Sequence, residues 1–521
     1  MTVLGHIIKR AITLRHYLNY SGHENPQYQN HELYSLLNKA QNTSFGKAYN
    51  FGDILDSRNY IAAFQQSVPI FDYDSIHQQW WHRALEGEAN VAWPGKIKYF
   101  ALTSGTSGAP NKYIPVSDEM ITRIQRAGIK QIYSLAAFNL PPAMFQKGVL
   151  ILGGSTQLTQ KDHYFEGDLS GISAMQIPSW FQHFYKPGAE ISAQRDWHSK
   201  LDEITKKAPE WDIGIVCGIP AWTQILFEKI INKYNLKTIH DIWPNLSVYI
   251  HGGVSFGPYQ RTFSRLVSRP LVNIETYIAS EGYLAFQRNP GSDMSLLMNN
   301  GIFFEFIPFN EHNFNQEGIP VAHPEVLTIS EVEEGHPYAL LLSTCAGAWR
   351  YLIGDVIQFT NVNTSEIIIT GRTKHFLNVC GEHLSVNNMV QAIQMLEDQF
   401  NISIPEFTTT GIPWQGRFAH KWYIGTHDYD ANNTESIRVE LDQNLMKVNH
   451  DYSVKRSEPL KTPLVEVIPI NLFYEWMERR GKMGGQNKFP RVLNKIQLPK
   501  WEKFLEEKGV TLNHQLQEDS G

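Results

Sequence analysis

Residues 102–112 read Leu-Thr-Ser-Gly-Thr-Ser-Gly-Ala-Pro-Asn-Lys and are the most distinctive local signal of the sequence. A strand-like run leads into hydroxyl side chains separated by glycines, and Lys112 follows. Glycines let backbone N–H groups approach a ligand closely, while hydroxyls and a lysine supply further donors, as phosphate oxygens require. It is not a Walker-type loop, because Gly105 and Gly108 are too close together and Tyr113 follows the lysine. The alternative is a Ser/Gly-rich surface turn.

Strand-like and helix-like segments alternate after this loop. Short β-rich runs are expected at residues 98–102, 149–152, 213–217, 246–250 and 271–277, and helices at 117–137, 197–208 and 220–234. Such alternation is typical of βαβ units and predicts a largely parallel or mixed sheet. Before the loop, the pattern predicts helices at 4–18, 32–41 and 75–87, with Asp74 as a possible cap of the last one.

The pattern of predicted strands and helices changes twice in the second half of the chain. From Gly301 onward, strand signals at 302–307, 325–332, 338–343, 356–360 and 366–370 predict an antiparallel sheet or a small β-barrel-like part. After Gly371, mixed signals return, with helices at 386–400 and 435–448 and strands at 408–412, 420–425 and 464–468. The predicted fold class is α/β, with a large N-terminal domain over residues 1–372 and a smaller α+β C-terminal domain over residues 373–521.

The composition is that of an ordinary globular protein. The 521 residues are 42% apolar and 19% charged, and 46 basic against 52 acidic side chains give a net charge of −6. These values exclude a disordered or fibrous protein and argue against a general binder of nucleic acid or anionic membranes, which needs a broad positive surface. Three cysteines without a C-x-x-C pair predict neither a disulfide framework nor a cysteine zinc site. With no signal peptide or spanning segment, we expect a soluble cytoplasmic protein.

A second motif, Thr-Tyr-Ile-Ala-Ser-Glu-Gly at residues 276–282, follows an apolar strand signal. Glu281 should therefore lie just past the carboxyl end of a strand, where open α/β sheets bind their ligands. Its carboxylate could hold Mg²⁺ against a triphosphate there, and a neighbouring aromatic ring could stack on a base. The alternative is the start of a helix, with Ser280 as its cap and Glu281 in its first turn.

Three further motifs place charged side chains beside glycines. Arg-Tyr-Leu-Ile-Gly-Asp at 350–355 offers the carboxylate of Asp355, an acceptor suited to a ribose diol, and a plain hairpin turn is the alternative. Gly-Arg-Thr-Lys at 371–374 lies at the expected domain boundary. Gly-Gly-Gln-Asn-Lys-Phe-Pro-Arg at 484–491 carries Lys488. For these last two motifs, the alternative is a solvated basic loop.

In this order and spacing, the five motifs resemble those of the acyl-adenylate-forming superfamily, and within it the Gretchen Hagen type acyl-acid amido synthetases. The resemblance rests on T-S-G-T-S-G…K, Y-x-x-S-E, R-Y-x-x-G-D and the late Q-x-K-x-P-R, which best separates this family from ordinary acyl-CoA ligases. Ala285 departs from a glycine that many relatives carry. The segment at 377–382 resembles bacterial rather than plant members, so plant hormone substrates are not implied. The implied fold is luciferase-like, with a mobile C-terminal domain.

The resemblance also implies a role for each motif residue toward ATP and Mg²⁺. The β- and γ-phosphates would be cradled by Thr103, Ser104, Gly105, Thr106, Ser107 and Gly108, with Lys112 as counter-charge. The adenosine would be bound by Gly252 and Gly253 in the adenine pocket, Tyr277 stacking on adenine, Asp355 on the ribose hydroxyls and Arg372 on ribose or phosphate.

The catalytic contacts implied in the same way lie nearer the α-phosphate. Ser280 would contact that phosphate, Glu281 would bind Mg²⁺, and Lys488 would bridge the carboxylate and the α-phosphate. The acid would lie against segments 121–137, 170–180 and 217–220, and Lys374 would lie at the hinge of the C-terminal domain. His251 is the one histidine that its neighbourhood singles out, and a packing role is expected for it.

The function implied is an ATP-dependent ligase. It would activate a carboxylic acid as an acyl-adenylate, release pyrophosphate and transfer the acyl group to an amine, an amino acid being expected. The alternative is an acid–CoA ligase with the same first step, and a third hypothesis, an inactive scaffold, is disfavoured because Lys488, Glu281 and Asp355 are all present. The expected partners are small molecules only, with no nucleic acid, membrane or protein partner required.

Overall fold

The computed structural model describes residues 2–19, 27–103, 112–315, 318–373, 377, 382, 384–415, 417–427, 434–456, 460–481, 488–494 and 496–512, and these form two compact units. The first unit lies within Met1–Gly105, Pro110–Val254 and Leu266–Ile369, and the second within Ser255–Arg265 and Thr370–Gly521. The functional domain boundary expected between residues 372 and 373 stays a prediction, although the units divide a few residues before it.

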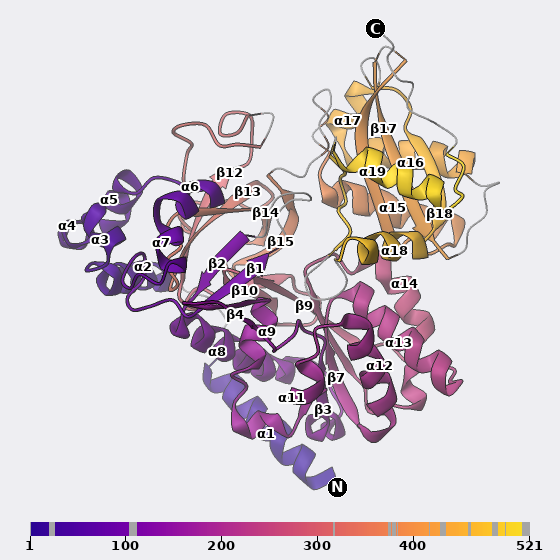
Figure 1. Ribbon diagram of the computed structural model, residues 1–521, viewed down its shortest axis with the longest axis horizontal. Helices are drawn as coiled ribbons and strands as arrows, with labels where there is room; N and C mark the ends of the chain where they lie inside the picture. The colour runs from indigo at the N-terminus through magenta and orange to yellow at the C-terminus, as the bar shows by residue number, and fades with distance from the viewer. Residues whose placement is uncertain are drawn as a thin grey trace. The chain divides into compact units, whose positions relative to one another are not determined.

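The first unit is built on an 11-stranded sheet with the order β12-β13-β14-β15-β11-β10-β9-β8-β7-β3-β6 (Figure 1). Its strands are β3 (Gly148–Ile151), β6 (Tyr185–Lys186), β7 (Ile213–Cys217), β8 (Val248–Gly252), β9 (Val272–Ala279), β10 (Gly282–Gln287), β11 (Met294–Leu296), β12 (Ile302–Pro308), β13 (Pro337–Thr344), β14 (Tyr351–Asn361) and β15 (Glu366–Arg372). Strands β6, β3, β7, β8 and β9 pair in parallel. The predicted α/β class and mixed sheet are confirmed.

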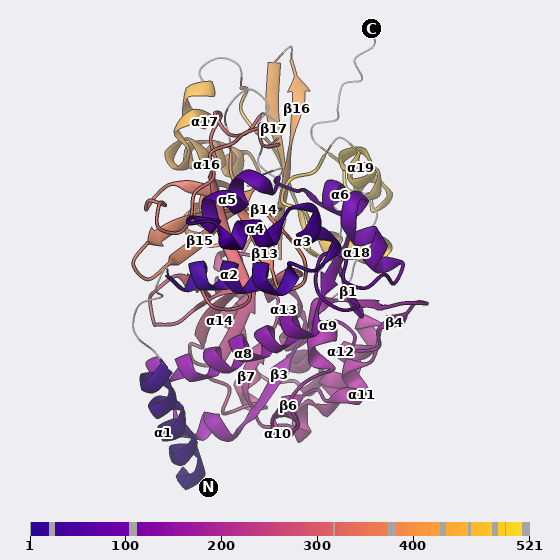
Figure 2. The same ribbon diagram turned by 90° about the vertical axis from the view of Figure 1, so that its left-hand side faces the viewer.

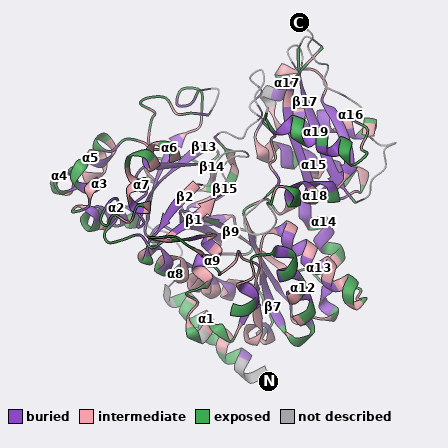
Figure 3. Ribbon diagram, viewed as in Figure 1, coloured by how far each residue is buried: buried purple, intermediate pink, exposed green. Residues whose placement is uncertain are grey.

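Apolar side chains cover the parallel half of this sheet, as its uniformly apolar strands predict. Ile215 of β7 and Val248 of β8 pack in one cluster with Leu135 and Met144, which lie in 3₁₀ turns before β3. Helices α12 (Trp197–Lys207) and α13 (Pro220–Tyr234) lie side by side next to β7 (Figure 1). Figure 3 shows the strands buried and the outward helix faces exposed.

Apart from α1, α2 and α8, the remaining helices of the first unit are shorter than α12 and α13. They are α1 (Thr2–Asn19), α2 (Gln27–Ala40), α3 (Ser44–Ala48), α4 (Phe51–Asp56), α5 (Tyr60–Ser67), α6 (Tyr73–Ile76), α7 (His82–Leu85), α8 (Asp118–Ser134), α9 (Leu169–Ala174), α10 (Ser179–Gln182) and α11 (Ala189–Ser192). Helix α2 packs on β12 and β13, and α3, α4 and α5 gather beside it (Figure 2). Among the described residues, no helix combines the length and the apolar character needed to cross a membrane.

Two local predictions for the first unit are wrong. The helix expected at 75–87 is capped by Asp72 rather than Asp74, because the Asp72 carboxylate accepts the Ser75 N–H at 2.9 Å and the helix begins at Tyr73. Residues 325–332 form no strand beyond an isolated bridge at Leu327. The Thr328 N–H and hydroxyl instead donate to the carboxylate of Glu331, a local turn that competes with strand pairing.

The strands after Gly301 do not form a sheet of their own. Strands β12, β13 and β14 pair antiparallel and β15 adjoins β14, so the expected barrel-like part is the antiparallel half of the 11-stranded sheet. A separate four-stranded sheet has the order β2-β1-β5-β4, from β1 (Tyr99–Thr103), β2 (Lys112–Val116), β4 (Thr159–Gln160) and β5 (Phe165–Gly167). Strand β2 was not expected, because its five residues look like the approach to the helix that follows.

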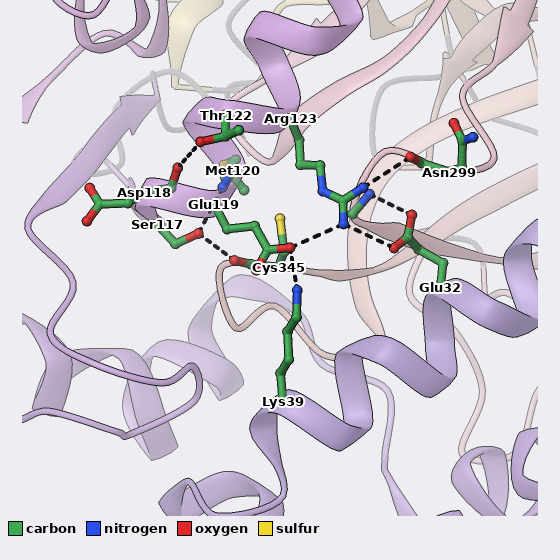
Figure 4. A network of polar contacts seen from close by, with 11 residues as sticks. Glu32, Lys39, Ser117, Asp118, Glu119, Met120, Thr122, Arg123, Asn299 and Cys345 are labelled. Carbon is green, nitrogen blue, oxygen red and sulfur yellow. Dashed lines mark hydrogen bonds and ion pairs between the residues drawn. The ribbon is translucent and has the colours of Figure 1, made fainter. Parts of the chain in front are cut away.

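A polar network fixes the start of α8 (Figure 4). Ser117 caps the helix by accepting the Met120 N–H at 3.0 Å. Arg123 on the next turns lies between two carboxylates, 3.2 Å from Glu119 and 3.6 Å from Glu32 of α2. Glu32 also accepts the N–H of Gly301, at 2.9 Å. Because opposite charges alternate and each is hydrogen-bonded, the network anchors α8 to α2 and to the turn before β12.

The second unit is a three-stranded sheet with helices on both faces. Its order is β16-β17-β18, and its elements are α14 (Gly257–Leu266), α15 (Val386–Phe400), β16 (Glu406–Trp414), β17 (Arg417–Thr426), α16 (Thr434–Val448), α17 (His450–Lys455), β18 (Leu464–Pro469), α18 (Asn471–Arg479) and α19 (Gln497–Glu507). Alternating residues of β17 serve different clusters, since Trp422 packs with α15 and α16 and Tyr423 packs with α18 and α19.

Helix α14 comes from the middle of the chain and packs within the second unit. The Tyr259 hydroxyl donates to the Glu406 carboxylate at 2.5 Å, and the hydroxyls of Thr262 and Ser403 lie 2.7 Å apart. Glu406 also pairs with Arg491 at 2.8 Å. The sequence around residue 260 gives no sign of this placement, because the contacts depend on residues that are far away along the chain.

Candidate active site

Four parallel strands of the first unit end at one edge of the sheet. Strands β3, β7, β8 and β9 pair in parallel, so their carboxyl ends meet there. Small residues follow each strand: Gly153 after β3, Gly218 after β7, Gly253 after β8 and Ser280 after β9. In open α/β sheets, this edge is where ligands bind, and the glycines keep it free of side chains.

Ser280 and Glu281 form the two-residue turn between β9 and β10. Ala279 pairs with Gly282 across this hairpin, and Gly282 has a φ of +145°, which suits glycine. Both turn side chains are buried, Ser280 at 4% and Glu281 at 6% exposure. Glu281 thus lies past the carboxyl end of a strand, as predicted, and the alternative of a helix start is wrong because the chain reverses directly into β10.

Tyr277 and Asp355 lie in contact although 78 residues separate them along the chain. The Tyr277 hydroxyl donates to the Asp355 carboxylate at 2.5 Å. Asp355 lies inside β14, at a bulge where residues 353–355 face Leu340 alone, and Gly354 has a φ of +89°. Bulges redirect side chains in this way. The alternative of a hairpin turn at Gly354 is wrong, because β14 continues to Asn361.

Gly252 and Gly253 lie beside the strand that carries Tyr277. Gly252 pairs with Thr276, and a Cβ added to Gly252 would lie 2.3 Å from the Thr276 carbonyl oxygen. Only glycine fits there. Gly253 has a φ of +83°, so it also requires glycine to avoid backbone strain. The two glycines therefore bring bare backbone up to the strand that carries Tyr277.

His251 precedes these glycines and is buried at 5% exposure. Its ring centroid lies 5.3 Å from that of Tyr249, at a tilt of 35°. Burial lowers the pKa of His251 to about 4, so the imidazole is neutral at neutral pH. These observations fit the packing role expected for this histidine.

Thr103 and Lys112 face each other at the base of the β1–β2 hairpin. They form the last antiparallel pair of these strands, and the Lys112 ammonium lies 5.2 Å from the centroid of the Tyr73 ring. The other predicted phosphate-loop residues lie outside the described residues: Ser104, Gly105, Thr106, Ser107 and Gly108. The two ends of the loop are thus held together by strand pairing.

Arg372 and Lys488 belong to the second unit. Arg372 is the last residue of β15 and is exposed, and Lys488 is also exposed. Lys374 lies outside the described residues. Arg491, three residues after Lys488, donates to Glu406 and stacks 4.4 Å from the Phe407 ring centroid. The chain just after Lys488 is therefore fixed to β16.

Two charged residues near the sheet edge were missed by the sequence analysis. Asp168 follows β5 and is partly buried, and Lys200 lies on α12 and is buried. Neither belongs to a recognisable motif, because an isolated Asp or Lys is common anywhere on a surface. Only the folded arrangement of β3, β5 and α12 brings them near each other.

The first unit thus combines several groups that suit a nucleotide. The Tyr277 hydroxyl donates to the Asp355 carboxylate, the glycine backbone at the end of β8 lies beside the strand of Tyr277, and a buried Ser-Glu turn follows that same strand. Carboxylate oxygens are also the ligands that Mg²⁺ prefers, and such sites commonly use one or two carboxylates together with phosphates. Glu281, a buried carboxylate on a two-residue turn, fits that chemistry.

Comparison with family models gives matches along most of the chain. The GH3 family N-terminal domain matches residues 18–201, the GH3 family central domain matches 295–372, and the GH3 family C-terminal domain matches 386–497. All three matches follow one another in chain order, as they would in a complete set of these domains.

Named relatives show the same likeness. Indole-3-acetic acid-amido synthetase GH3.4 of Arabidopsis thaliana is 26% identical, over 89% of this chain and 88% of that protein. Jasmonoyl–L-amino acid synthetase GH3.5 of Oryza sativa subsp. japonica is 23% identical, over 62% of this chain and 66% of that protein. The two relatives are thus named for different acids.

Solved structures share the fold. The GH3.15 acyl acid amido synthetase superimposes with a TM-score of 0.76 at 16% identity, over 96% of each chain. A 2-hydroxyisobutyryl-CoA ligase in its postadenylation state superimposes with a TM-score of 0.59 at 11% identity, over 92% of this chain and 91% of that one. The luciferase-like adenylating fold predicted from the motifs is therefore confirmed.

Proposed function

The chain belongs to the GH3 family, and we infer from this membership that it is an ATP-dependent ligase that joins a carboxylic acid to an amino acid. The observation that carries this conclusion is the full-length likeness to amido synthetases, since GH3.4 aligns over nearly nine-tenths of both chains. The acid is first activated as an acyl-adenylate with release of pyrophosphate, and the amine then displaces AMP to give the amide.

The two-step route answers a chemical difficulty. A carboxylate repels nucleophiles and has no good leaving group. Attack of the carboxylate on the α-phosphorus of ATP creates a mixed anhydride, from which AMP leaves readily. The enzyme must therefore neutralise phosphate charge, align the carboxylate with phosphorus and exclude water from the anhydride.

Residue roles at the nucleotide are part of the proposal. The Tyr277 ring stacks on adenine beside Gly252 and Gly253, and the Asp355 carboxylate accepts the ribose hydroxyls. The 2.5 Å hydrogen bond between Tyr277 and Asp355 supports this, because it sets the carboxylate next to the ring that would carry the base. Arg372 reaches the ribose or a phosphate.

Phosphate and metal contacts complete the proposed site. The loop from Thr103 to Gly108 cradles the β- and γ-phosphates with Lys112 as counter-charge, and Ser280 contacts the α-phosphate. Glu281 holds Mg²⁺, which supplies positive charge to the triphosphate when bound. The buried position of Glu281 on a short turn supports this role, because a desolvated carboxylate interacts strongly with a cation.

Lys488 bridges the acid carboxylate and the α-phosphate in the adenylation step. We assign residues 1–372 to a domain that binds ATP and the acid, and residues 373–521 to a smaller domain that supplies this lysine and rotates about a hinge near Lys374. Rotation lets one cleft use Lys488 first and admit the amine afterwards.

The setting of the enzyme follows from its substrates. ATP, acid and amino acid are small soluble molecules, so we place the enzyme in the cytoplasm, with no need of a membrane, nucleic acid or protein partner. The sequence at residues 377–382 supports a bacterial type of GH3 enzyme, and the acids of the plant relatives are not transferred to it.

Pyrophosphate release tests the proposed function. The enzyme with ATP and Mg²⁺ is offered a panel of carboxylic acids, and each active acid is then combined with amino acids or with CoA. We expect release that depends on the acid and a product heavier by one amino-acid residue. A thioester product would establish the CoA ligase instead, and release that ignores the acid would refute both.

A hydroxyl deletion tests the proposed nucleotide contact. Tyr277→Phe keeps the ring but removes the donor to Asp355, so KM for ATP should rise about 5-fold, the equivalent of about 1 kcal/mol for one hydrogen bond. Tyr283→Phe is the matched control, because the buried Tyr283 hydroxyl has no hydrogen-bond partner among the described residues. Equal effects of both changes on KM would contradict the contact.

A further inference from the structure

Asp168 carries a partly buried carboxylate that the local structure does not use. It is the residue between β5 and α9, yet its side chain makes no capping hydrogen bond to α9. In the described part of the chain the carboxylate accepts no hydrogen bond at all. It is turned toward Gly154 instead, where an added Cβ would lie 2.1 Å from Oδ2. A partly buried carboxylate that accepts no hydrogen bond from the protein keeps its full capacity to accept hydrogen bonds from a ligand.

Lys200 is the complementary group. Its side chain projects from α12 and is 3% exposed. Nζ donates to the Gly153 carbonyl oxygen at 3.3 Å and lies 5.7 Å from the Trp197 ring centroid. An ammonium has three donors, so one carbonyl leaves most of its hydrogen-bonding capacity unused within the described residues.

The two charges influence each other without forming an ion pair. Burial raises the pKa of Asp168, and the Lys200 ammonium opposes that rise. Burial lowers the pKa of Lys200 to about 8, and Asp168 opposes that fall. No ion pair joins them in the described structure, although a buried pair in contact would relieve both desolvation penalties. The two opposite charges therefore lie near enough to shift each other's pKa, but they form no ion pair within the described residues.

Strand pairing places this pair at the edge that carries the proposed site. Strand β5 runs parallel to β1, with Gly167 opposite Ala101, so Asp168 lies beside the residue that precedes Thr103. Gly153 and Gly154 directly follow β3. The Gly154 N–H donates to the Ser170 hydroxyl at 2.9 Å, and Ser170 begins the segment assigned to the acid. The pair thus lies next to the start of the phosphate loop and to the acid segment.

We propose that Asp168 and Lys200 form the binding site of the acceptor amino acid, with Asp168 on its α-ammonium group and Lys200 on its α-carboxylate. This assignment rests on the proposed function. A zwitterion carries opposite charges on groups attached to one carbon, so it requires two opposite protein charges that are held apart. Glycine at 154 lets the Asp168 carboxylate lie against the backbone after β3, because a side chain at Gly154 would overlap Asp168.

The site predicts which acceptors are used. An α-amino acid satisfies both charges, whereas its carboxamide leaves Lys200 without a counter-charge. The thiol of CoA satisfies neither charge. Amino acids should therefore be preferred over carboxamides by the wild-type enzyme, with the difference expressed in KM for the acceptor.

Lys200→Met tests the assignment, because methionine keeps an apolar stem and removes the charge. KM for the best amino acid should rise about 10–100-fold, the range expected for a lost charge-assisted hydrogen bond. KM for the carboxamide of that amino acid should change little, so the preference for the amino acid disappears. Asp168→Asn should raise KM for both acceptors, since both carry the ammonium. Lys206→Met is the control, because Lys206 is an exposed lysine on the same helix.

The outcomes separate this proposal from the proposed function. Acid-dependent exchange of pyrophosphate into ATP, measured without acceptor, reports adenylation alone, and its absence from the wild type would refute the function itself. If exchange is present but Lys200→Met raises KM for amino acid and carboxamide equally, the acceptor site is wrong and the function stands. Should that variant fail to fold, the wild type still decides, because equal use of amino acid and carboxamide would overturn the site.

Discussion

Replacing Lys488 with alanine is expected to lower the rate of adenylate formation by about 10²–10³-fold, as for other charge-matched transition-state contacts. The ammonium would bridge the two negatively charged reactants, the acid carboxylate and the α-phosphate, and nothing in alanine replaces it. Because the lysine acts before pyrophosphate leaves, a chemically prepared acyl-adenylate should still react with the amino acid. The two half-reactions are measured separately, by pyrophosphate exchange and by amide formation from the adenylate.

The matched control for this variant is Lys500→Ala, which removes another exposed lysine of the second unit. It should leave both half-reactions unchanged. A Lys488→Ala variant that loses both half-reactions to the same extent would contradict the role assigned to this lysine, since that result would point to a general disturbance of the unit.

Glu281→Gln should also lower the rate of adenylation by about 10²–10³-fold. Glutamine has nearly the same shape as glutamate, so the turn between β9 and β10 should persist, but the negative charge that would hold Mg²⁺ is gone. The rate is measured over a range of Mg²⁺ concentrations. The variant should require much more Mg²⁺ to reach half of its maximal rate, and chelation of Mg²⁺ should stop the wild type.

Glu333→Gln serves as the control for charge removal, because Glu333 is an exposed carboxylate of the first unit. It should leave the Mg²⁺ dependence unchanged. If Glu281→Gln lowers the rate without moving the Mg²⁺ dependence, Glu281 does not bind the metal.

Much of the fold could be predicted from local sequence patterns. Apolar strands such as Ile213–Cys217 and helices such as Pro220–Tyr234 and Val386–Phe400 begin and end where periodicity places them. Parallel strands covered on both faces are uniformly apolar, and amphipathic helices repeat every three to four residues, so each pattern is decided within its own segment.

The local sequence left two readings open at places where distant pairing decides the structure. Gly354-Asp355 has the composition of a hairpin turn, but pairing of β14 with β13 makes it a bulge within a strand. Ser280-Glu281 has the composition of a helix start, but Gly282 pairs with Ala279 and turns the chain into β10. In both cases neighbouring residues permit two structures, and only the partner strand selects one.

The charged groups beyond the motifs were harder still to foresee. Asp168 and Lys200 approach each other because β5, β3 and α12 converge, and no spacing along the chain encodes this. Arg491 was noticed only as the end of a motif, whereas the structure shows its guanidinium holding Glu406 and stacking on Phe407. A long-range contact of this kind has no local signature in one sequence.

Isotope transfer shows whether the acid attacks the α-phosphorus of ATP before its acyl group passes to an amine. The acid is labelled with ¹⁸O in both carboxylate oxygens, and the nucleotide product of a complete reaction is examined by mass spectrometry. We expect AMP carrying one ¹⁸O, since the oxygen that attacks phosphorus stays with AMP when the amine breaks the acyl C–O bond. Unlabelled AMP, or ADP with labelled phosphate, would contradict it.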